Sequence, residues 1–202
     1  MSSSNSTTRI LDAALMLVTK RGGADVTMAE VAKAAAISRQ GVYLHFAHRA
    51  AFMLALVRHV HEKFGVAEEQ RKVTEAPTGI AAMHEWVSLQ VRLNPVTCSV
   101  VRAFEVVRRT DEAAEQGWQD RQAHRLEVCR GIVSRMREEE TLKPGISQDE
   151  AADLLWSITS LRTWEDLVLQ RGWTATQYEE RVTRFLCHGL TNDATGGDSA
   201  KP

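Results

Sequence analysis

Apolar side chains recur every three or four residues along most of this chain, and this spacing predicts helices. No segment shows the strict alternation of apolar and polar residues that a half-buried strand requires. The N-terminal part divides into four predicted helices. The first covers residues 10–21 and ends at Gly22-Gly23, and the second begins at a capping box from Thr27 to Glu30 and ends near Ala34. The third begins at a cap on Ser38 and ends near Leu44, and the fourth has apolar positions from His48 to Phe64. The pattern therefore predicts an all-α fold.

The remainder of the chain predicts longer helices, separated by proline, glycine and capping residues. Breaks are predicted at residues 74–79 and 143–145, and one helix is predicted to end and the next to start at Asn94-Pro95. Helix starts are predicted at a cap on Asp111 and at the capping boxes of Ser147 with Glu150 and of Thr174 with Gln177. The last two helices are predicted to end near Leu169 and Leu190. Residues 191–202 are small and polar, which predicts a disordered tail.

Composition and charge add a division into a head and a body. The chain has 202 residues, of which 44% are hydrophobic and 25% are charged, as in an ordinary soluble globular protein. Residues 1–60 carry seven Lys or Arg and three acids, whereas the remainder is acidic overall. A basic head on an acidic body is typical of a protein whose head alone meets a polyanion.

Several features predict a cytoplasmic protein without membrane contact. The cysteines Cys98, Cys129 and Cys187 are odd in number and far apart, which indicates buried, reduced thiols rather than disulfides. Residues 2–8 lack the apolar core of a signal peptide. The longest apolar run, residues 50–57, is too short to cross a bilayer.

Motifs of enzymes, cofactor sites and metal sites are missing. The sequence contains no phosphate-binding loop, no G-x-G-x-x-G and no G-x-S-x-G. His59 and His61 are two residues apart and point to different faces of a helix, and no His-Glu-x-x-His occurs. We therefore expect neither catalysis nor a bound cofactor or metal ion.

The second and third predicted helices form the most informative segment. Their connection, Ala35-Ala36-Ile37, is too tight for anything but a helix-turn-helix crossing, and the small residues Ala32 and Ala35 let the two backbones approach closely. A three-helix core that binds nothing is disfavoured, because its exposed face would hold Arg, Gln, His and Tyr rather than a mixture of Glu and Lys.

The N-terminus of the second helix of such a unit enters the major groove of DNA. Arg39 can bond guanine bidentately, and Gln40 can do the same with adenine. Tyr43 is compatible with a phosphate contact and also with a partly buried position. The predicted DNA-contacting residues are Thr27, Ser38, Arg39, Gln40, Gly41, Tyr43, His45 and Arg49.

More than ten positions of this segment agree in order, spacing and residue type with a known pattern, Thr27-x-x-x-Val31-Ala32-x-x-Ala35-Ala36-Ile37-Ser38-x-x-x-Val42-Tyr43-x-His45-Phe46-x-x-Arg49-x-x-Phe52. The segment resembles the head of tetracycline-repressor (TetR) family regulators, and the resemblance covers most of the first 60 residues. Residues 151–160 and 171–173 resemble, more loosely, the body of one subgroup of that family.

Three departures from the family pattern concern the head. Ala36 stands where the family often has glycine, which implies either a corner without positive φ or slight strain. Gly41 stands where a hydroxyl residue is common, so one phosphate contact is lost. Arg49 replaces a usual lysine, and either side chain can contact phosphate.

The resemblance also implies a ligand pocket in the body, lined by Trp86, Phe104, Trp118, Trp156 and Thr159. Aromatic residues at helical spacing equally suit a plain core, so both interpretations stay open. If the pocket exists, its aromatic walls indicate an apolar or aromatic small molecule.

We expect a helix-turn-helix DNA-binding domain over residues 7–50 and a ligand-sensing and dimerisation domain over residues 51–190. Apolar stripes near residues 147–171 and 174–190 predict a homodimer with a four-helix interface, most clearly through Tyr178, Val182, Phe185 and Leu186. A two-fold dimer presents two recognition helices to successive major grooves, which predicts a palindromic operator.

These features predict a sequence-specific transcriptional regulator, a repressor that a small hydrophobic or aromatic ligand releases from double-stranded operator DNA by displacing the fourth helix. An activator, or a regulator that answers to a protein partner, is the alternative. An enzyme with a borrowed helix-turn-helix is a third class, which the missing catalytic motifs disfavour.

Overall fold

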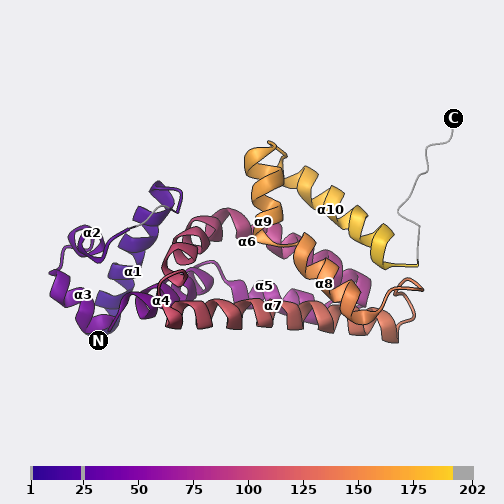
Figure 1. Ribbon diagram of the computed structural model, residues 1–202, viewed down its shortest axis with the longest axis horizontal. Coiled ribbons are helices and arrows are strands. Elements are labelled where there is room, and N and C mark those ends of the chain that lie inside the picture. Colours follow the sequence, from indigo (N-terminus) through magenta and orange to yellow (C-terminus); the bar gives the residue numbers. More distant parts are fainter. Residues whose placement is uncertain (1, 24–25, 193–202) are drawn as a thin grey trace. The chain divides into compact units, whose positions relative to one another are not determined.

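The computed structural model describes residues 2–23 and 26–192, and this part of the chain is almost entirely helical (Figure 1). Its helices are α1 (Ser2–Lys20), α2 (Met28–Ala34), α3 (Arg39–His45), α4 (Arg49–Lys63), α5 (Val66–Glu75), α6 (Gly79–Arg108), α7 (Glu112–Glu138), α8 (Gln148–Ile158), α9 (Leu161–Trp164), the π-helical segment η1 (Glu165–Gln170) and α10 (Ala175–Leu190). The all-α prediction is confirmed: the described residues form no strand, only an isolated bridge between Leu142 and Thr191. Within them, no helix is both long and apolar enough to span a membrane.

Local capping interactions set the helices of the head where the sequence predicts them. The Thr27 hydroxyl accepts a hydrogen bond from the Glu30 backbone N–H at 3.3 Å, and the Glu30 carboxylate accepts one from the Thr27 backbone N–H at 2.9 Å. This reciprocal pair is the predicted capping box. Ser38 caps α3 in the same way, since its Oγ accepts from the Gly41 backbone N–H at 3.0 Å.

Helix α1 ends as predicted but begins earlier. Gly22 and Gly23 adopt positive φ values of 61° and 89°, which stop the helix after Lys20. The start at Ser2 lies before the predicted start of the head near residue 7. Residues 2–8 are polar and carry no apolar periodicity, so the pattern offered no sign that they are helical.

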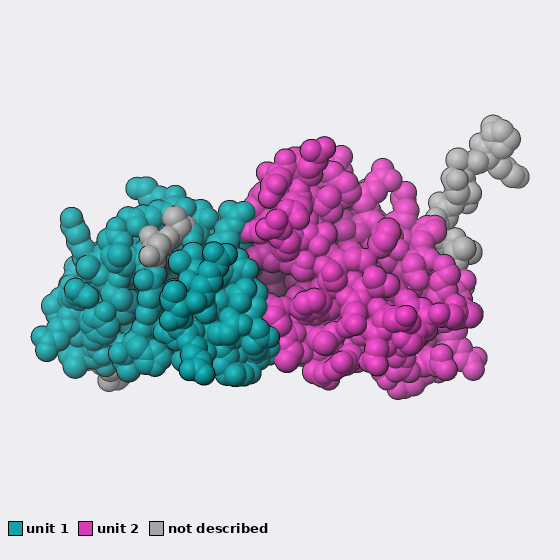
Figure 2. All heavy atoms as spheres, in the orientation of Figure 1, with its two compact units in different colours: residues 1–66, 95–121 teal, residues 67–94, 122–202 magenta. Residues whose placement is uncertain are grey.

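The described residues form two compact units (Figure 2): those within residues 1–66 and 95–121, and those within residues 67–94 and 122–202. Helices α6 and α7 each contribute to both units, and α6 passes from one unit to the other between Asn94 and Pro95. The first unit is thus larger than the predicted head. The assignment of DNA binding to residues 7–50 and of ligand sensing to residues 51–190 stays a prediction.

The predicted helix end at Asn94-Pro95 is wrong, because Pro95 lies inside the continuous helix α6. An interior proline lacks the N–H that would bond to the carbonyl four residues earlier and costs about 3 kcal/mol. Helix α6 nevertheless continues, since Trp86 and Val87 before Pro95, and Val100 and Phe104 after it, are all buried. Burial on both sides of the proline outweighs its local preference.

Two helix breaks were not predicted. Gly65, with φ 62°, lies just after the last predicted apolar position of α4, Phe64, and separates α4 from a further helix, α5, that the sequence did not predict. Ser160 caps α9 by accepting from the Thr163 backbone N–H at 3.2 Å, so the helix expected to run through Leu169 stops at Ile158. Apolar spacing resumes after each break, which is why periodicity alone did not reveal them.

The start of the predicted disordered tail is ordered. Thr191 is buried, and its backbone N–H donates to the Cys187 carbonyl at 2.9 Å. Asn192 donates from its backbone N–H to the Thr141 carbonyl at 3.1 Å and from Nδ2 to the Glu140 carbonyl at 2.7 Å. The prediction of disorder is therefore wrong for these two residues, and residues 193–202 lie outside the described part of the chain.

The predicted centre of the dimer interface lies largely inside the second unit. Tyr178, Val182 and Leu186 on α10 are buried in the core of their own chain, so they are not available to a partner. Phe185, which precedes Leu186 on α10, is 63% exposed, and Leu154 on α8 is 44% exposed. The sequence pattern gave the apolar stripe of α10 but not its partner, which is the chain's own α6, α7 and α8 core.

The three cysteines are free, as predicted. Cys98 and Cys129 are buried, whereas Cys187 is only partly buried, with its Sγ 3.2 Å from His84 Nε2. The prediction of three buried thiols is thus corrected for Cys187.

Candidate nucleic-acid interface and candidate ligand site

The helix-turn-helix is held together by a small apolar core. Val31, Ala32, Ala35 and Val42 are buried between α1, α2 and α3. The Ile37 backbone N–H donates to the Ala32 carbonyl at 3.0 Å, which closes the turn. These contacts fix α3 against α2, so that the remaining face of α3 is left to solvent.

Ala36 forms the corner of this turn with φ 52°. A left-handed conformation costs a residue with a Cβ about 1–2 kcal/mol, whereas glycine adopts it freely. Of the two alternatives for Ala36, strain is therefore the one that the structure has. Gly41, by contrast, lies in regular helix without positive φ, although a Cβ built on it would lie 3.3 Å from the capping oxygen of Ser38.

The exposed face of α3 is polar at its N-terminal end. Ser38, Arg39 and Gln40 are exposed, and the Arg39 guanidinium lies 5.8 Å from the centroid of the Tyr43 ring. Tyr43 is 40% exposed. Its side chain is therefore partly buried and still accessible to a phosphate, so the two predicted environments are compatible with each other. The sequence predicts base contacts for Arg39 and Gln40, and the structure leaves both side chains accessible for them.

Two predicted DNA contacts have hydroxyls that already serve as helix caps. The Thr27 hydroxyl accepts from the Glu30 backbone N–H and donates to the Glu30 carboxylate at 2.8 Å, and the Ser38 hydroxyl accepts from Gly41. Both residues remain exposed. A phosphate contact by either one has to share the hydroxyl with its cap.

His45 and Arg49 flank the end of α3. His45 Nδ1 lies 3.0 Å from the Thr7 hydroxyl, a hydrogen bond that ties α3 to α1. Both His45 and Arg49 are partly buried. Leu44, which was not among the predicted contacts, is 83% exposed one turn after Gln40 on the same face. Its spacing from Gln40 is the signal that would have identified it.

An ion pair stabilises the entrance to α2. Arg21 Nη2 lies 2.5 Å from Glu30 Oε1. The hydrogen bond from Arg21, followed by those from the Thr27 backbone and hydroxyl, lowers the pKa of Glu30 to about 2. The acidic charge of Glu30 is thus matched by Arg21, which limits its repulsion of a nearby phosphate.

The predicted ligand-lining residues divide between the two units. In the second unit, Trp86 Nε1 donates to the Thr159 hydroxyl at 2.9 Å, and Trp156 lies with Trp86 around the guanidinium of Arg125. In the first unit, Phe104 and Trp118 stack with their ring centroids 6.2 Å apart. The structure therefore brings together Trp86, Trp156 and Thr159 as one group and Phe104 with Trp118 as another. Their role in binding a ligand stays a prediction.

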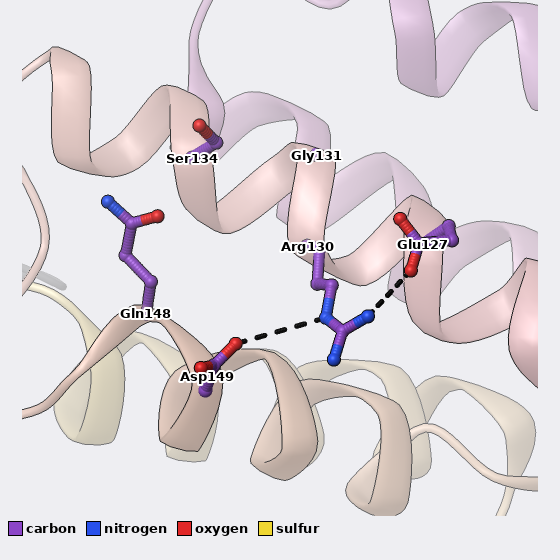
Figure 3. Close-up of a pocket in the computed structure, with 6 residues that line it drawn as sticks. All are labelled: Glu127, Arg130, Gly131, Ser134, Gln148 and Asp149. Atoms are coloured by element: carbon purple, nitrogen blue, oxygen red, sulfur yellow. Dashed lines mark hydrogen bonds and ion pairs between the residues drawn. The ribbon is translucent and has the colours of Figure 1, made fainter.

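A separate surface hollow of about 320 Å³ lies between α7 and α8, lined by Glu127, Arg130, Gly131, Ser134, Gln148 and Asp149 (Figure 3). Figure 3 shows Arg130 extended between two carboxylates, with N–O distances of 2.6 Å to Glu127 and 3.9 Å to Asp149. Its lining is polar, and none of the predicted ligand-binding residues contributes to it. This hollow does not match an aromatic-walled pocket.

Comparison with known proteins identifies the head. Residues 10–56 match the family described as bacterial regulatory proteins, tetR family. The transcriptional repressor LfrR of Mycolicibacterium smegmatis is 32% identical over 91 residues, which are 45% of this chain and 47% of that repressor. The match thus spans about half the length of the curated relative.

Solved structures support the same fold over nearly the whole chain. NalD of Pseudomonas aeruginosa, the secondary repressor of the MexAB-OprM multidrug efflux pump, superposes with a TM-score of 0.72 at 19% identity, over 96% of this chain and all of NalD. A regulator from Saccharomonospora viridis in complex with choline superposes with a TM-score of 0.79 at 18% identity, over 95% of this chain and all of that one. Residues 10–56 of this chain therefore form a domain that matches the tetR family of bacterial regulatory proteins.

Proposed function

We propose that this protein is a sequence-specific DNA-binding transcriptional regulator, and specifically a repressor that leaves its operator when a small molecule binds. The observation that carries the proposal is the exposed polar face of α3, held in place by the buried Val42. The family match over residues 10–56 and the repressor relatives support it.

In this proposal, α3 enters the major groove. Arg39 and Gln40 contact base edges, because their long, exposed side chains carry the donors and acceptors that distinguish guanine and adenine. Leu44 supplies an apolar contact, of the kind that recognises a thymine methyl group. Tyr43, His45 and Arg49, together with the capping residues Thr27 and Ser38 and the backbone of Gly41, contact phosphates.

We further propose a homodimer that reads a palindromic operator. Since Tyr178, Val182 and Leu186 are buried within their own chain, the interface is formed instead by the outer faces of α8 and α10, where Leu154 and Phe185 are exposed. Two-fold symmetry would present one recognition helix to each half-site.

Release from DNA requires the ligand to change the position of the head. Helix α4 is tied to α1 by Asp12, whose Oδ1 lies 3.0 Å from His59 Nε2 and 2.6 Å from Lys63 Nζ. A ligand that favours a displaced α4 therefore also moves α1, and through the Thr7 to His45 hydrogen bond it affects α3. These contacts would couple a ligand-induced shift of α4 to the position of α3.

The test is selection of bound sequences from random DNA duplexes by the purified full chain, repeated with a panel of apolar small molecules. We expect a palindromic consensus, and release of the DNA by at least one compound. An activator, or a regulator controlled by a protein partner, predicts the same consensus without release by any compound. The absence of binding to every duplex at low ionic strength would disprove the proposal.

A further inference from the structure

The second unit contains an arginine whose charge has no acidic partner among the described residues. Arg125, on α7, donates from Nη1 to Gln122 Oε1 at 3.2 Å. Its Nη2 donates to the backbone carbonyls of Trp156 and Thr159 at 3.2 and 3.3 Å. The guanidinium faces the rings of Trp86 and Trp156, at 5.9 and 5.7 Å from their centroids. All of these partners are neutral.

The titratable groups beside Arg125 do not supply the missing negative charge. Burial raises the pKa of the Cys129 thiol to about 12 and that of the Tyr178 phenol to about 12, so both are neutral at physiological pH. Burial lowers the pKa of Arg125 below its ordinary value, but a guanidinium remains protonated in a protein. The cluster therefore carries one net positive charge.

A second polar group of the cluster is unsatisfied. Trp156 Nε1 is buried and has no hydrogen-bond partner among the described residues. A buried donor without an acceptor is costly, so it marks a place where an acceptor from another molecule would be stabilising. Trp86 and Thr159 are buried, whereas Gln122, Arg125 and Trp156 keep some exposure, which leaves the cluster an accessible rim.

Another arginine in the chain shows what a compensated version of this arrangement looks like. Arg108 lies 4.7 Å from the centroid of the Trp118 ring, and its Nη1 is 2.8 Å from a carboxylate oxygen of Glu115. Arg125 has the aromatic neighbours but lacks the carboxylate. The carbonyls at the end of α8 carry only partial negative charge, so they stabilise the guanidinium without neutralising it.

We propose that Arg125 and Trp156 bind the carboxylate of an apolar or aromatic acid, and that this acid is the effector of the regulator. The guanidinium and the indole N–H donate to the two carboxylate oxygens, while the rings of Trp86 and Trp156 contact the apolar body. A cationic ligand is disfavoured, because Arg125 already places a positive charge against both rings. The effector role rests on the proposed function, whereas the binding site does not.

The first experiment measures charge selectivity on the full chain by isothermal titration calorimetry. The probes are benzoate, 2-naphthoate and decanoate, with 2-naphthamide and trimethyl(2-naphthyl)ammonium as an uncharged and a cationic analogue. We expect at least one carboxylate to bind, and 2-naphthoate to bind about tenfold or more tightly than its amide. Failure of all three carboxylates to bind, or equal binding of the amide or the ammonium compound, would overturn the proposal.

The second experiment assigns the site. Arg125→Gln should weaken carboxylate binding by about tenfold or more and leave binding of the amide unchanged. Trp156→Phe keeps an aromatic ring and removes only the N–H, and it should weaken carboxylate binding by about fivefold. Arg130→Gln, on the exposed side of the same helix, is the matched control and should bind as the wild type does.

Thermal unfolding of Arg125→Gln separates a structural role of Arg125, which bonds to the end of α8, from a role in ligand binding. If Arg125→Gln does not fold, Trp156→Phe and the charge selectivity of the wild type still decide the proposal. Wild-type carboxylate affinity in a folded Trp156→Phe variant, together with weak charge selectivity, contradicts it.

DNA binding is measured separately by gel shift. If the protein binds DNA but shows no carboxylate selectivity, the carboxylate site is disproved and the proposed function stands. If it binds carboxylates selectively but binds no duplex, the proposed function is disproved and the carboxylate site stands. If both hold, 2-naphthoate or another bound carboxylate should release wild-type protein from its operator and should fail to release Arg125→Gln.

Discussion

The head of the first unit and the arginine cluster of the second unit place their polar side chains in opposite environments. On α3, Arg39 and Gln40 extend into solvent, whereas Arg125 is enclosed by rings and carbonyls. The hydrogen bond that caps the start of α3 joins residues three positions apart, but the bonds that connect Arg125 and Trp86 to the end of α8 join residues 31 to 73 positions apart. The first site thus depends on local sequence, and the second exists only once the chain has folded.

Gly23 is subject to both a local constraint, its backbone conformation, and a tertiary one, its close approach to α6. Its substitution should therefore have the largest effect on the free energy of unfolding. Its φ of 89° favours glycine, and a Cβ at this position would lie 2.5 Å from Arg102 Cβ and 2.8 Å from the Ser99 carbonyl oxygen on α6. Gly23→Ala should lower the free energy of unfolding by about 2–4 kcal/mol, because strain and steric overlap add. Urea unfolding measures this change.

The neighbouring Gly22 separates the two causes. It has φ 61°, but nothing lies within 4 Å of a Cβ built on it. Gly22→Ala should cost only about 1 kcal/mol, from backbone conformation alone. Equal losses for the two variants would mean that the contact with α6 contributes nothing to the stability of the head.

Arg39→Ala tests the exposed site and should have the next largest effect. If Arg39 contacts a base, its loss should weaken operator binding by about 1–3 kcal/mol and relax the preference at one position of each half-site. The stability of the protein should not change, because Arg39 is exposed and its guanidinium lies as far as 5.8 Å from the centroid of the Tyr43 ring. Gel shifts with the selected operator and with single-base variants measure both quantities.

Arg58→Ala is the matched control for the loss of one positive charge, because Arg58 is exposed on α4 and outside the predicted contacts. It should weaken binding to all duplexes slightly and equally. Unchanged base preference in Arg39→Ala would remove Arg39 from the base-contacting set and leave it a phosphate contact at most.

The same contrast explains how much the sequence predicted. The caps at Thr27 and Ser38, the start of α4 near His48 and the boxes at Ser147 and Thr174 are local patterns, and the structure confirms each of them. Helix α6 was predicted as two helices because Pro95 is a strong local signal, yet burial on both sides of it keeps the helix continuous. Local rules failed where contacts between distant residues decided.

The candidate sites follow the same rule. Arg39, Gln40 and Tyr43 were predicted from a turn and a spacing, and the structure leaves all three exposed. Arg125 was not predicted, because nothing in its neighbourhood along the chain indicates that Trp86 and Thr159 lie beside it. Its missing carboxylate is visible only from tertiary contacts.

In the described part of the chain, two residues other than glycine have positive φ, one in each unit, and their substitution by glycine should have a smaller effect on the free energy of unfolding. Ala36 in the turn of the head has φ 52°, and Glu140 after α7 has φ 56°. Ala36→Gly and Glu140→Gly should each raise the free energy of unfolding by about 1 kcal/mol, since relief of strain exceeds the entropy that glycine adds to the unfolded chain. Ala34→Gly, in regular helix, should lower it by about 1 kcal/mol. Gains confined to one unit would show that the two turns are not equally strained.

The smallest effect concerns the ion pair at the start of α2. The Arg21 hydrogen bond, with those from Thr27, lowers the pKa of Glu30 to about 2 from an ordinary value of 4.5. The stabilisation that this provides is complete above pH 4.5 and is lost as the pH falls toward 2, because the unfolded chain takes up the proton first. The side chains of Arg21 and Glu30 are 39% and 38% exposed, so solvent screens the pair.

Glu30→Gln should therefore lower the urea midpoint at pH 7, and the difference from wild type should shrink at pH 3. Glu62→Gln, which changes an exposed carboxylate on α4 outside the capping box, is the control for the change of charge. A difference for Glu30→Gln that stays the same at both pH values would mean that the neutral box, with its hydrogen bonds to Thr27, stabilises the start of α2 and that the charge of Glu30 does not. The entrance to the helix-turn-helix would then depend on local hydrogen bonding alone.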